Sequence, residues 1–147
     1  MTRLWRISNY ADLTGEGGLH FPGRWNSKGR PIIYTAEHSA GAMMEHLAHL
    51  DRAMMPKIFQ LIEIEIGDSV KIADLASGAL PLKWIFNEDT TRAIGDAWLK
   101  NAASLALRVP SVLVPDSWNV LLNPAHPDAR HMKIVKTQRV PLDARLH

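Results

Sequence analysis

The chain has 147 residues, 46% of them hydrophobic and 22% charged, which is typical of one globular domain. Its 17 Lys and Arg residues against 15 Asp and Glu residues give a net charge of +2, too low to indicate a dedicated nucleic-acid-binding protein. The lack of cysteine excludes disulfides, thiolate metal ligands and a cysteine nucleophile, and with no signal peptide or membrane-spanning run we expect a cytoplasmic protein.

Six short segments have the composition or alternation of β-strands. The clearest is 57–66, in which three isoleucines alternate with two glutamates. The others, in chain order, are 31–34, 70–74, 111–114, 119–122 and 132–140.

Two longer segments predict helices. The first covers about 40–50 with Ser39 as its N-cap, and the second covers about 91–107 with Asp89 or Thr90 as its N-cap. Strands and helices therefore alternate irregularly along the chain. This order predicts an α+β fold, a compact single domain with a mixed central sheet and flanking helices.

Glu45 occupies an unusual place on the first predicted helix. At 100° per residue, Met43, Leu47 and Leu50 form one apolar stripe, and Glu45 lies almost opposite, close to Gly41. A solvated helix face usually carries several Lys, Glu and Gln residues, whereas this one has small residues around a single carboxylate. Such a face would let a ligand lie close to the helix; the alternative is a surface glutamate on an ordinary amphipathic helix.

The segment 21–30, FPGRWNSKGR, combines two glycines with two arginines. Glycine lets the backbone turn sharply or approach a ligand, and the planar forks of Arg24 and Arg30 suit carboxylate or phosphate groups. No Gly-Lys-Ser/Thr sequence opens a helix here, so this is not a Walker A loop. Composition alone leaves open an anion site or a surface loop pinned by Trp25.

A third group of polar residues lies between 111 and 127. Ser111 would stand at a strand end, where ligand-binding groups often gather, and Asn119 and His126 could bind a ligand or satisfy local turns. The seven histidines form no His-Glu-x-x-His pattern, so we expect no metal site.

Together these clusters resemble the RES domain family, which is named for its Arg, Glu and Ser. The resemblance covers nearly the whole chain, so we expect residues 1–147 to form a RES domain. Arg6 is a looser match, in a place where members carry a basic residue, and His20 stands where Arg is more usual. The matching segments follow the family's order: 4–7, 23–26, 33–37, 42–47, 108–111, 119–127 and 143–146.

The resemblance implies a fold like that of ADP-ribosyltransferases and an enzyme that consumes NAD. Family members are bacterial toxins of type II toxin–antitoxin pairs, usually encoded beside an antitoxin with an Xre-like helix-turn-helix domain. Some split NAD by hydrolysis or phosphorolysis, and at least one type transfers ADP-ribose to a protein. We therefore expect a growth-arresting toxin that cleaves the nicotinamide–ribose bond, or alternatively a protein ADP-ribosyltransferase, with NAD as substrate and no cofactor.

The resemblance also assigns the site. Cleavage passes through an oxocarbenium-like transition state that a carboxylate stabilises, which suits Glu45. Arg24 would pair with the pyrophosphate. Tyr34 would stack on nicotinamide and offer its hydroxyl, and Ser111 would orient the carboxamide or a ribose hydroxyl. The catalytic set is Arg24, Tyr34, Glu45 and Ser111, and the NAD-binding set adds Arg6 and Asn119.

Two other classes of function stay open. One is a ribonuclease toxin that uses His126, Glu45 and the basic C-terminal strand, although the near-neutral charge counts against it. The other is a non-catalytic nucleotide-binding module. As partners we expect NAD and an Xre-like antitoxin, with no direct contact to nucleic acid or membrane. A homodimer is also open, because Trp84 and Phe86 would mark a protein-binding surface unless they belong to the core.

Overall fold

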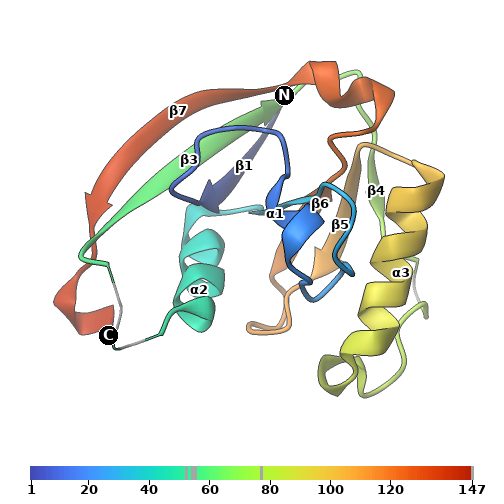
Figure 1. Cartoon of the computed structure of the whole chain (residues 1–147), viewed down its shortest axis with the longest axis horizontal. Helices are drawn as coiled ribbons and strands as arrows, with labels where there is room; N and C mark the ends of the chain where they lie inside the picture. Colours follow the sequence, from blue (N-terminus) through green and yellow to red (C-terminus); the bar gives the residue numbers. More distant parts are fainter. Residues whose placement is uncertain (52, 54–55, 77, 147) are drawn as a thin grey trace.

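The computed structural model describes residues 1–51, 53, 56–76 and 78–146. Within this part of the chain, seven strands form one mixed sheet in the order β4-β5-β6-β2-β1-β3-β7. β4 and β5 are parallel, and the other neighbouring strands are antiparallel. The predicted α+β domain with a mixed sheet and flanking helices is confirmed (Figure 1).

Five of the predicted strands are present within two residues of their expected bounds. The described helices include none that is long and apolar enough to cross a bilayer. The strands are β1 (Thr2–Ile7), β2 (Ile33–Ala36), β3 (Ile58–Ile66), β4 (Ile72–Asp74), β5 (Ala106–Pro110), β6 (Trp118–Leu122) and β7 (Met132–Pro141). The helices are α1 (Gly17–His20), α2 (Ser39–His49) and α3 (Glu88–Asn101), with 3-10 turns η2 (Trp84–Phe86), η3 (Pro127–His131) and η4 (Ala144–Leu146).

Two predictions are wrong around β5. The segment 111–114 is not a strand, because Ser111 lies in the turn that follows β5. The helix predicted over 91–107 ends early: α3 stops at Asn101, and Ala102 takes the left-handed conformation with φ of 46°. The following residues alternate between the two faces of the sheet, since Ala106 and Leu107 belong to different core clusters.

The ends of both main helices also differ slightly from expectation. Asn87, not Asp89 or Thr90, caps α3, and its side-chain oxygen accepts a hydrogen bond of 3.2 Å from the Thr90 amide. α2 begins at Ser39 itself. β1 has no counterpart among the predicted strands.

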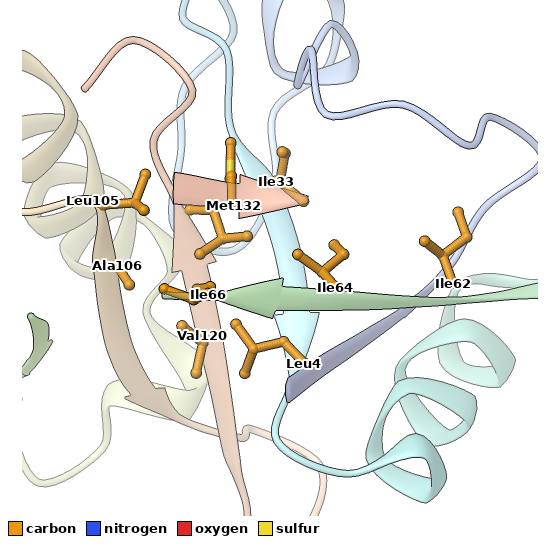
Figure 2. Packing of buried hydrophobic residues seen from close by; sticks show 10 residues of the cluster. Leu4, Ile33, Ile62, Ile64, Ile66, Leu105, Ala106, Val120 and Met132 are labelled. Carbon is orange, nitrogen blue, oxygen red and sulfur yellow. The ribbon is translucent and has the colours of Figure 1, made fainter. Parts of the chain in front are cut away.

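One face of the sheet carries the larger core cluster, to which β1, β2, β3, β5, β6 and β7 all contribute (Figure 2). Each fully buried aliphatic side chain of this kind stabilises the fold by about 1.5–3 kcal/mol. The buried members are Leu4, Ile33, Ile62, Ile64, Ile66, Leu105, Ala106, Val120, Leu122 and Met132.

The opposite face carries a second cluster and the two long helices. Leu121 of β6 packs there with Trp98 and Leu99 of α3 and with Trp25, which is 2% exposed. α2 lies against β1 and β2, as Figure 1 shows, while α3 lies beside β4 and β5. The two helices therefore stand over separate parts of one sheet face, and β6 runs between the strands that they cover.

Candidate active site

Glu45 projects from α2 towards the central strands. Its half-buried carboxylate oxygen Oε1 accepts a hydrogen bond of 2.9 Å from Asn119 Nδ2 and one of 3.3 Å from Ser111 Oγ. The buried side of α2 is centred on Ala42, with Met43 and Leu47 only half-buried, so the helix is rotated relative to the predicted stripe. Glu45 therefore lies at the edge of the buried side, aimed at β6, and is not a surface residue.

The Ser111 hydroxyl forms hydrogen bonds both as a donor and as an acceptor. The oxygen accepts hydrogen bonds from the Leu113 and Val114 amides at 3.1 and 3.3 Å, and the hydroxyl donates to Glu45. The Ser111 amide donates to Ser117 O at 2.9 Å, which closes the loop between β5 and β6. Ser111 thus holds this loop against the Glu45 carboxylate, a geometry that suits orientation and not nucleophilic attack.

Tyr34 lies on β2 opposite Leu121, and Asn119 lies on β6 opposite Ala36. Tyr34 and Asn119 therefore share a sheet face as diagonal cross-strand neighbours. The Tyr34 hydroxyl donates to Asn26 Oδ1 and accepts a hydrogen bond of 3.1 Å from the Trp25 amide. Burial of the hydroxyl raises the pKa of Tyr34 to about 12, so the phenol stays neutral, while 36% of the residue's surface remains exposed.

Arg24 stands in the loop that the Tyr34 hydroxyl contacts. Its Nη1 donates a hydrogen bond of 3.1 Å to Ile85 O of η2, and its Nη2 lies 3.6 Å from Glu88 Oε1 at the start of α3. Glu88 also pairs with Arg92 at 2.9 Å. The Arg24 side chain is 24% exposed, and Glu88 partly neutralises its charge.

The loop that carries Arg24 is fixed to α3 by contacts that local sequence patterns do not reveal. Arg92 Nε donates to Gly23 O at 2.9 Å, and the Thr91 hydroxyl, fully buried, donates to Arg24 O. Gly95 lies directly beneath the loop, where a Cβ atom would be 1.6 Å from Trp25 O. The only sequence signal for this packing is the glycine within a helical pattern.

Arg6 does not join the other predicted site residues. It lies on β1 opposite Ile62, two residues from Leu4, and both of these belong to the cluster that contains Ile33. Because successive side chains of a strand alternate between faces, Tyr34 points to the other face. Burial lowers the pKa of Arg6 from its usual range, although the charge of Asp12 opposes this shift.

A hollow of about 180 Å³ adjoins the Glu45 contacts. Ligand pockets commonly measure about 300–1,000 Å³, so this hollow is smaller than a typical ligand pocket. Its lining residues are Ala40, Gly41, Met44, Ser111, Val114, Ser117, Trp118 and Asn119. Gly41, a small residue of the predicted ligand-facing side, thus lies beside open space, whereas Ala42, expected on the same side, is buried.

A second hollow, of about 270 Å³, lies between the segment 27–30 and α3. Lys28, Arg30 and Lys100 line it together with Asp96, whose carboxylate is engaged by the Ser27 amide at 2.8 Å. It contains none of the predicted catalytic residues. In the described part of the chain, no group of three or more His, Asp or Glu side chains is placed to hold a metal ion.

The structure therefore divides the predicted residues into three places. Glu45, Ser111 and Asn119 are joined directly by hydrogen bonds. Tyr34 neighbours Asn119 on the same sheet face, and its hydroxyl reaches the loop that carries Arg24. Arg6 alone lies on the other face.

Comparison with known proteins identifies the same family in the sequence and in its relatives. The RES domain family model matches residues 3–143. A protein named Toxin Res from Pseudomonas putida is 43% identical over 145 residues, covering 97% of this chain and 98% of the relative. A Prs ADP-ribosylating toxin from Sphingobium sp. is 37% identical over 155 residues, covering 99% and 96%.

A solved structure supports the fold. The toxin–antitoxin complex MbcT–MbcA of M. tuberculosis contains a chain that matches with a TM-score of 0.77, covering 95% of this chain and 84% of that one. The sequences are 18% identical, so this likeness concerns the fold alone.

Proposed function

The chain belongs to the RES domain family, whose matched relatives are toxins, and from that premise we propose that it cleaves NAD at the nicotinamide–ribose bond. The observation that carries the proposal is the Glu45 carboxylate. Two side-chain donors orient it beside a hollow, and an aromatic ring lies on the same sheet face. This arrangement suits a reaction that develops positive charge on a sugar.

In the proposed reaction the electron pair of the C1′–N bond leaves with nicotinamide, which departs as a neutral base. The ribose then carries oxocarbenium character, which the Glu45 carboxylate stabilises electrostatically. Asn119 and Ser111 keep that carboxylate oriented before the substrate arrives, so less reorganisation is needed during the reaction. The acceptor's nucleophilic atom then forms a bond to C1′ and the acceptor's proton passes to solvent, which completes the transfer.

Arg24 is the proposed partner of the pyrophosphate. A guanidinium presents paired donors that match phosphate oxygens. In the structure this side chain is shared between Ile85 O and Glu88, so NAD would replace a weak contact of 3.6 Å by a stronger one. The neighbouring Arg92 would keep Glu88 paired after Arg24 turns to the ligand.

Transfer of ADP-ribose to a protein is the second candidate, favoured by the name of the Sphingobium relative, an ADP-ribosylating toxin. Both reactions use the same bond cleavage and differ only in the acceptor: water or phosphate in one, a protein side chain in the other. The ribonuclease alternative has no comparable support. His126 caps η3 by accepting a 3.0 Å hydrogen bond from the Asp128 amide, and Lys133 of the basic strand pairs with Glu65 at 3.3 Å.

We also propose that the toxin is neutralised by an antitoxin in the cytoplasm. The structural neighbour comes from a toxin–antitoxin complex, and the family resemblance implies an Xre-like antitoxin. The two aromatic residues of η2 differ in their surroundings. Trp84 packs on Trp25 with 6.1 Å between ring centroids, whereas Phe86 is 81% exposed and is available to a partner or a second copy.

The test compares Glu45→Gln with the wild type for release of nicotinamide from NAD. We expect kcat to fall by about 10²–10³-fold with folding intact, because a neutral amide cannot stabilise a developing cation. Glu16→Gln is the matched control, since the Glu16 side chain is 71% exposed and forms a long ion pair of 3.7 Å with His20. Reactions run with phosphate, without phosphate and with cell extract identify the acceptor. A folded wild-type protein that leaves NAD intact in all three would contradict the proposal.

A further inference from the structure

We propose that Asn26 is a positioning residue that holds Arg24 in place for the pyrophosphate of NAD by fixing the backbone on both sides of it. The inference rests on the proposed function, because it concerns the same substrate. Asn26 itself does not contact the hollow beside Glu45 and has no place among the predicted catalytic residues.

The side chain of Asn26 is buried, with 1% of the residue exposed, and all of its polar atoms are used. Its Nδ2 donates to Phe21 O and to Ser27 O, both at 3.2 Å, and its Oδ1 accepts from the Tyr34 hydroxyl. A buried carboxamide with every group satisfied is stable in one orientation. Asn26 therefore joins the two ends of the loop and ties it to β2.

These contacts help to fix the position of the backbone at Arg24. The Gly23 amide donates to Asn26 O at 3.0 Å, and the Trp25 amide donates to the Tyr34 hydroxyl that Asn26 orients. A Cβ atom on Gly23 would lie 2.5 Å from that hydroxyl, so the backbone here passes as close to Tyr34 as glycine allows. The backbone before and after Arg24 is thus held at the Gly23 amide and at the Trp25 amide, in addition to the bonds that α3 makes to Gly23 O and Arg24 O.

The same contacts limit what Tyr34 can do. A phenol has one proton to donate, and Tyr34 donates it to Asn26. The hydroxyl is therefore not available as a donor to NAD, which leaves the exposed part of the ring for contact with a substrate. Precise placement matters for a bidentate arginine, because an error of about 1 Å can cost as much as 10²-fold in rate.

The experiment is a double-mutant cycle read by the dissociation constant of ADP-ribose, which contains the pyrophosphate but not nicotinamide. Asn26→Ala is made in the wild type and in Arg24→Ala, and binding is measured by calorimetry. If Asn26 acts through Arg24, we expect about tenfold weaker binding in the wild-type background, as for loss of one charge-assisted contact, and no further weakening in Arg24→Ala. Asn9→Ala, at an exposed position outside the site, is the control.

Tyr34→Phe keeps the test decisive if Asn26→Ala does not fold, because it removes only the hydroxyl and leaves both Nδ2 bonds in place. We expect it to raise the KM for NAD more than it lowers kcat, and this increase should also vanish in Arg24→Ala. Equal weakening by Asn26→Ala in both backgrounds would mean a purely structural role and overturn the inference.

The two proposals fail in different ways. A wild-type protein that cleaves NAD, while Asn26→Ala binds ADP-ribose as tightly as wild type, overturns the inference alone. A wild-type protein that shows the expected coupling for ADP-ribose but releases no nicotinamide supports the positioning role and overturns the proposed reaction. A wild-type protein that binds no ADP-ribose overturns both.

Discussion

The two sides of the candidate site are built in different ways. We call the loop Gly23–Asn26 with its contacts to Tyr34 and α3 the arginine side, and the group Glu45, Ser111 and Asn119 the carboxylate side. The arginine side is held largely through backbone atoms, whereas the carboxylate side is held through side chains from three separate elements. The first is a fixed frame, and the second leaves space for a substrate.

The difference is visible in packing as well as in hydrogen bonds. On the arginine side Trp25, Asn26 and Thr91 are at most 2% exposed. On the carboxylate side Glu45 and Asn119 remain half-buried, and a hollow of about 180 Å³ adjoins them. Substrate binding and product release require such access, while precise placement of a guanidinium requires tightly packed supporting residues. The two sides therefore satisfy two requirements that one kind of packing could not meet together.

Glycines in the two long helices give the sharpest test of this contrast, and Gly95→Ala has the largest expected effect. In an open helix the change stabilises by about 0.5–1 kcal/mol. Here the added Cβ would lie 1.6 Å from Trp25 O, a contact with backbone that no rotamer change relieves. We expect a loss of about 3 kcal/mol in the free energy of unfolding, measured by urea denaturation. Unchanged stability would show that the arginine side can move.

Such contacts explain how much could be predicted from the sequence. Local patterns were sufficient for β3, whose isoleucines alternate, and for the existence of α2 and α3. The sequence does not predict β1, because arginines interrupt its apolar residues. Its strand character comes from pairing with β3, which is distant in the sequence. The end of α3 is not predicted either, since the left-handed position is occupied by Ala102 and not by the glycine that usually signals it.

The site shows the same limit. The helix pattern indicates Glu45, the family resemblance assigns Ser111 a role, and the polar cluster between 111 and 127 supplies Asn119. The structure places both Ser111 and Asn119 within hydrogen-bonding distance of Glu45. Asn26 lies inside the segment 21–30, but local sequence assigns it no role, because its partner Tyr34 is eight residues away on another element. Local patterns do not encode which side chain satisfies a buried amide, since that depends on tertiary packing.

Tyr34 joins the two sides, and its burial should make the stability of the protein depend on pH. Burial raises the pKa of Tyr34 to about 12 in the folded protein, whereas an unfolded tyrosine loses its proton near pH 10. Between these values the folded state holds more protons, so the free energy of unfolding falls as pH rises from about 10 towards 12. Tyr34→Phe should reduce this fall.

The measurement is urea denaturation at about pH 9 and about pH 11, with Tyr10→Phe as the control because Tyr10 is 74% exposed. The control should lose stability over this interval as the wild type does. If Tyr34→Phe loses as much, the Tyr34 hydroxyl is not enclosed in solution, and the arginine side is less rigid than its hydrogen bonds indicate.

Gly41→Ala, on the carboxylate side, has the smallest expected effect on stability. Its Cβ would meet Ala36 Cβ at 3.3 Å, a tight contact that a shift of a few tenths of an ångström relieves. That small cost opposes the gain of about 0.5–1 kcal/mol from replacing glycine in a helix, so the net change should be near zero. The added methyl group should instead raise the KM for NAD a few-fold, because Gly41 lines the hollow beside Glu45. A stability loss as large as that of Gly95→Ala would show that both sides are equally rigid, and an unchanged KM would place the substrate away from this helix face.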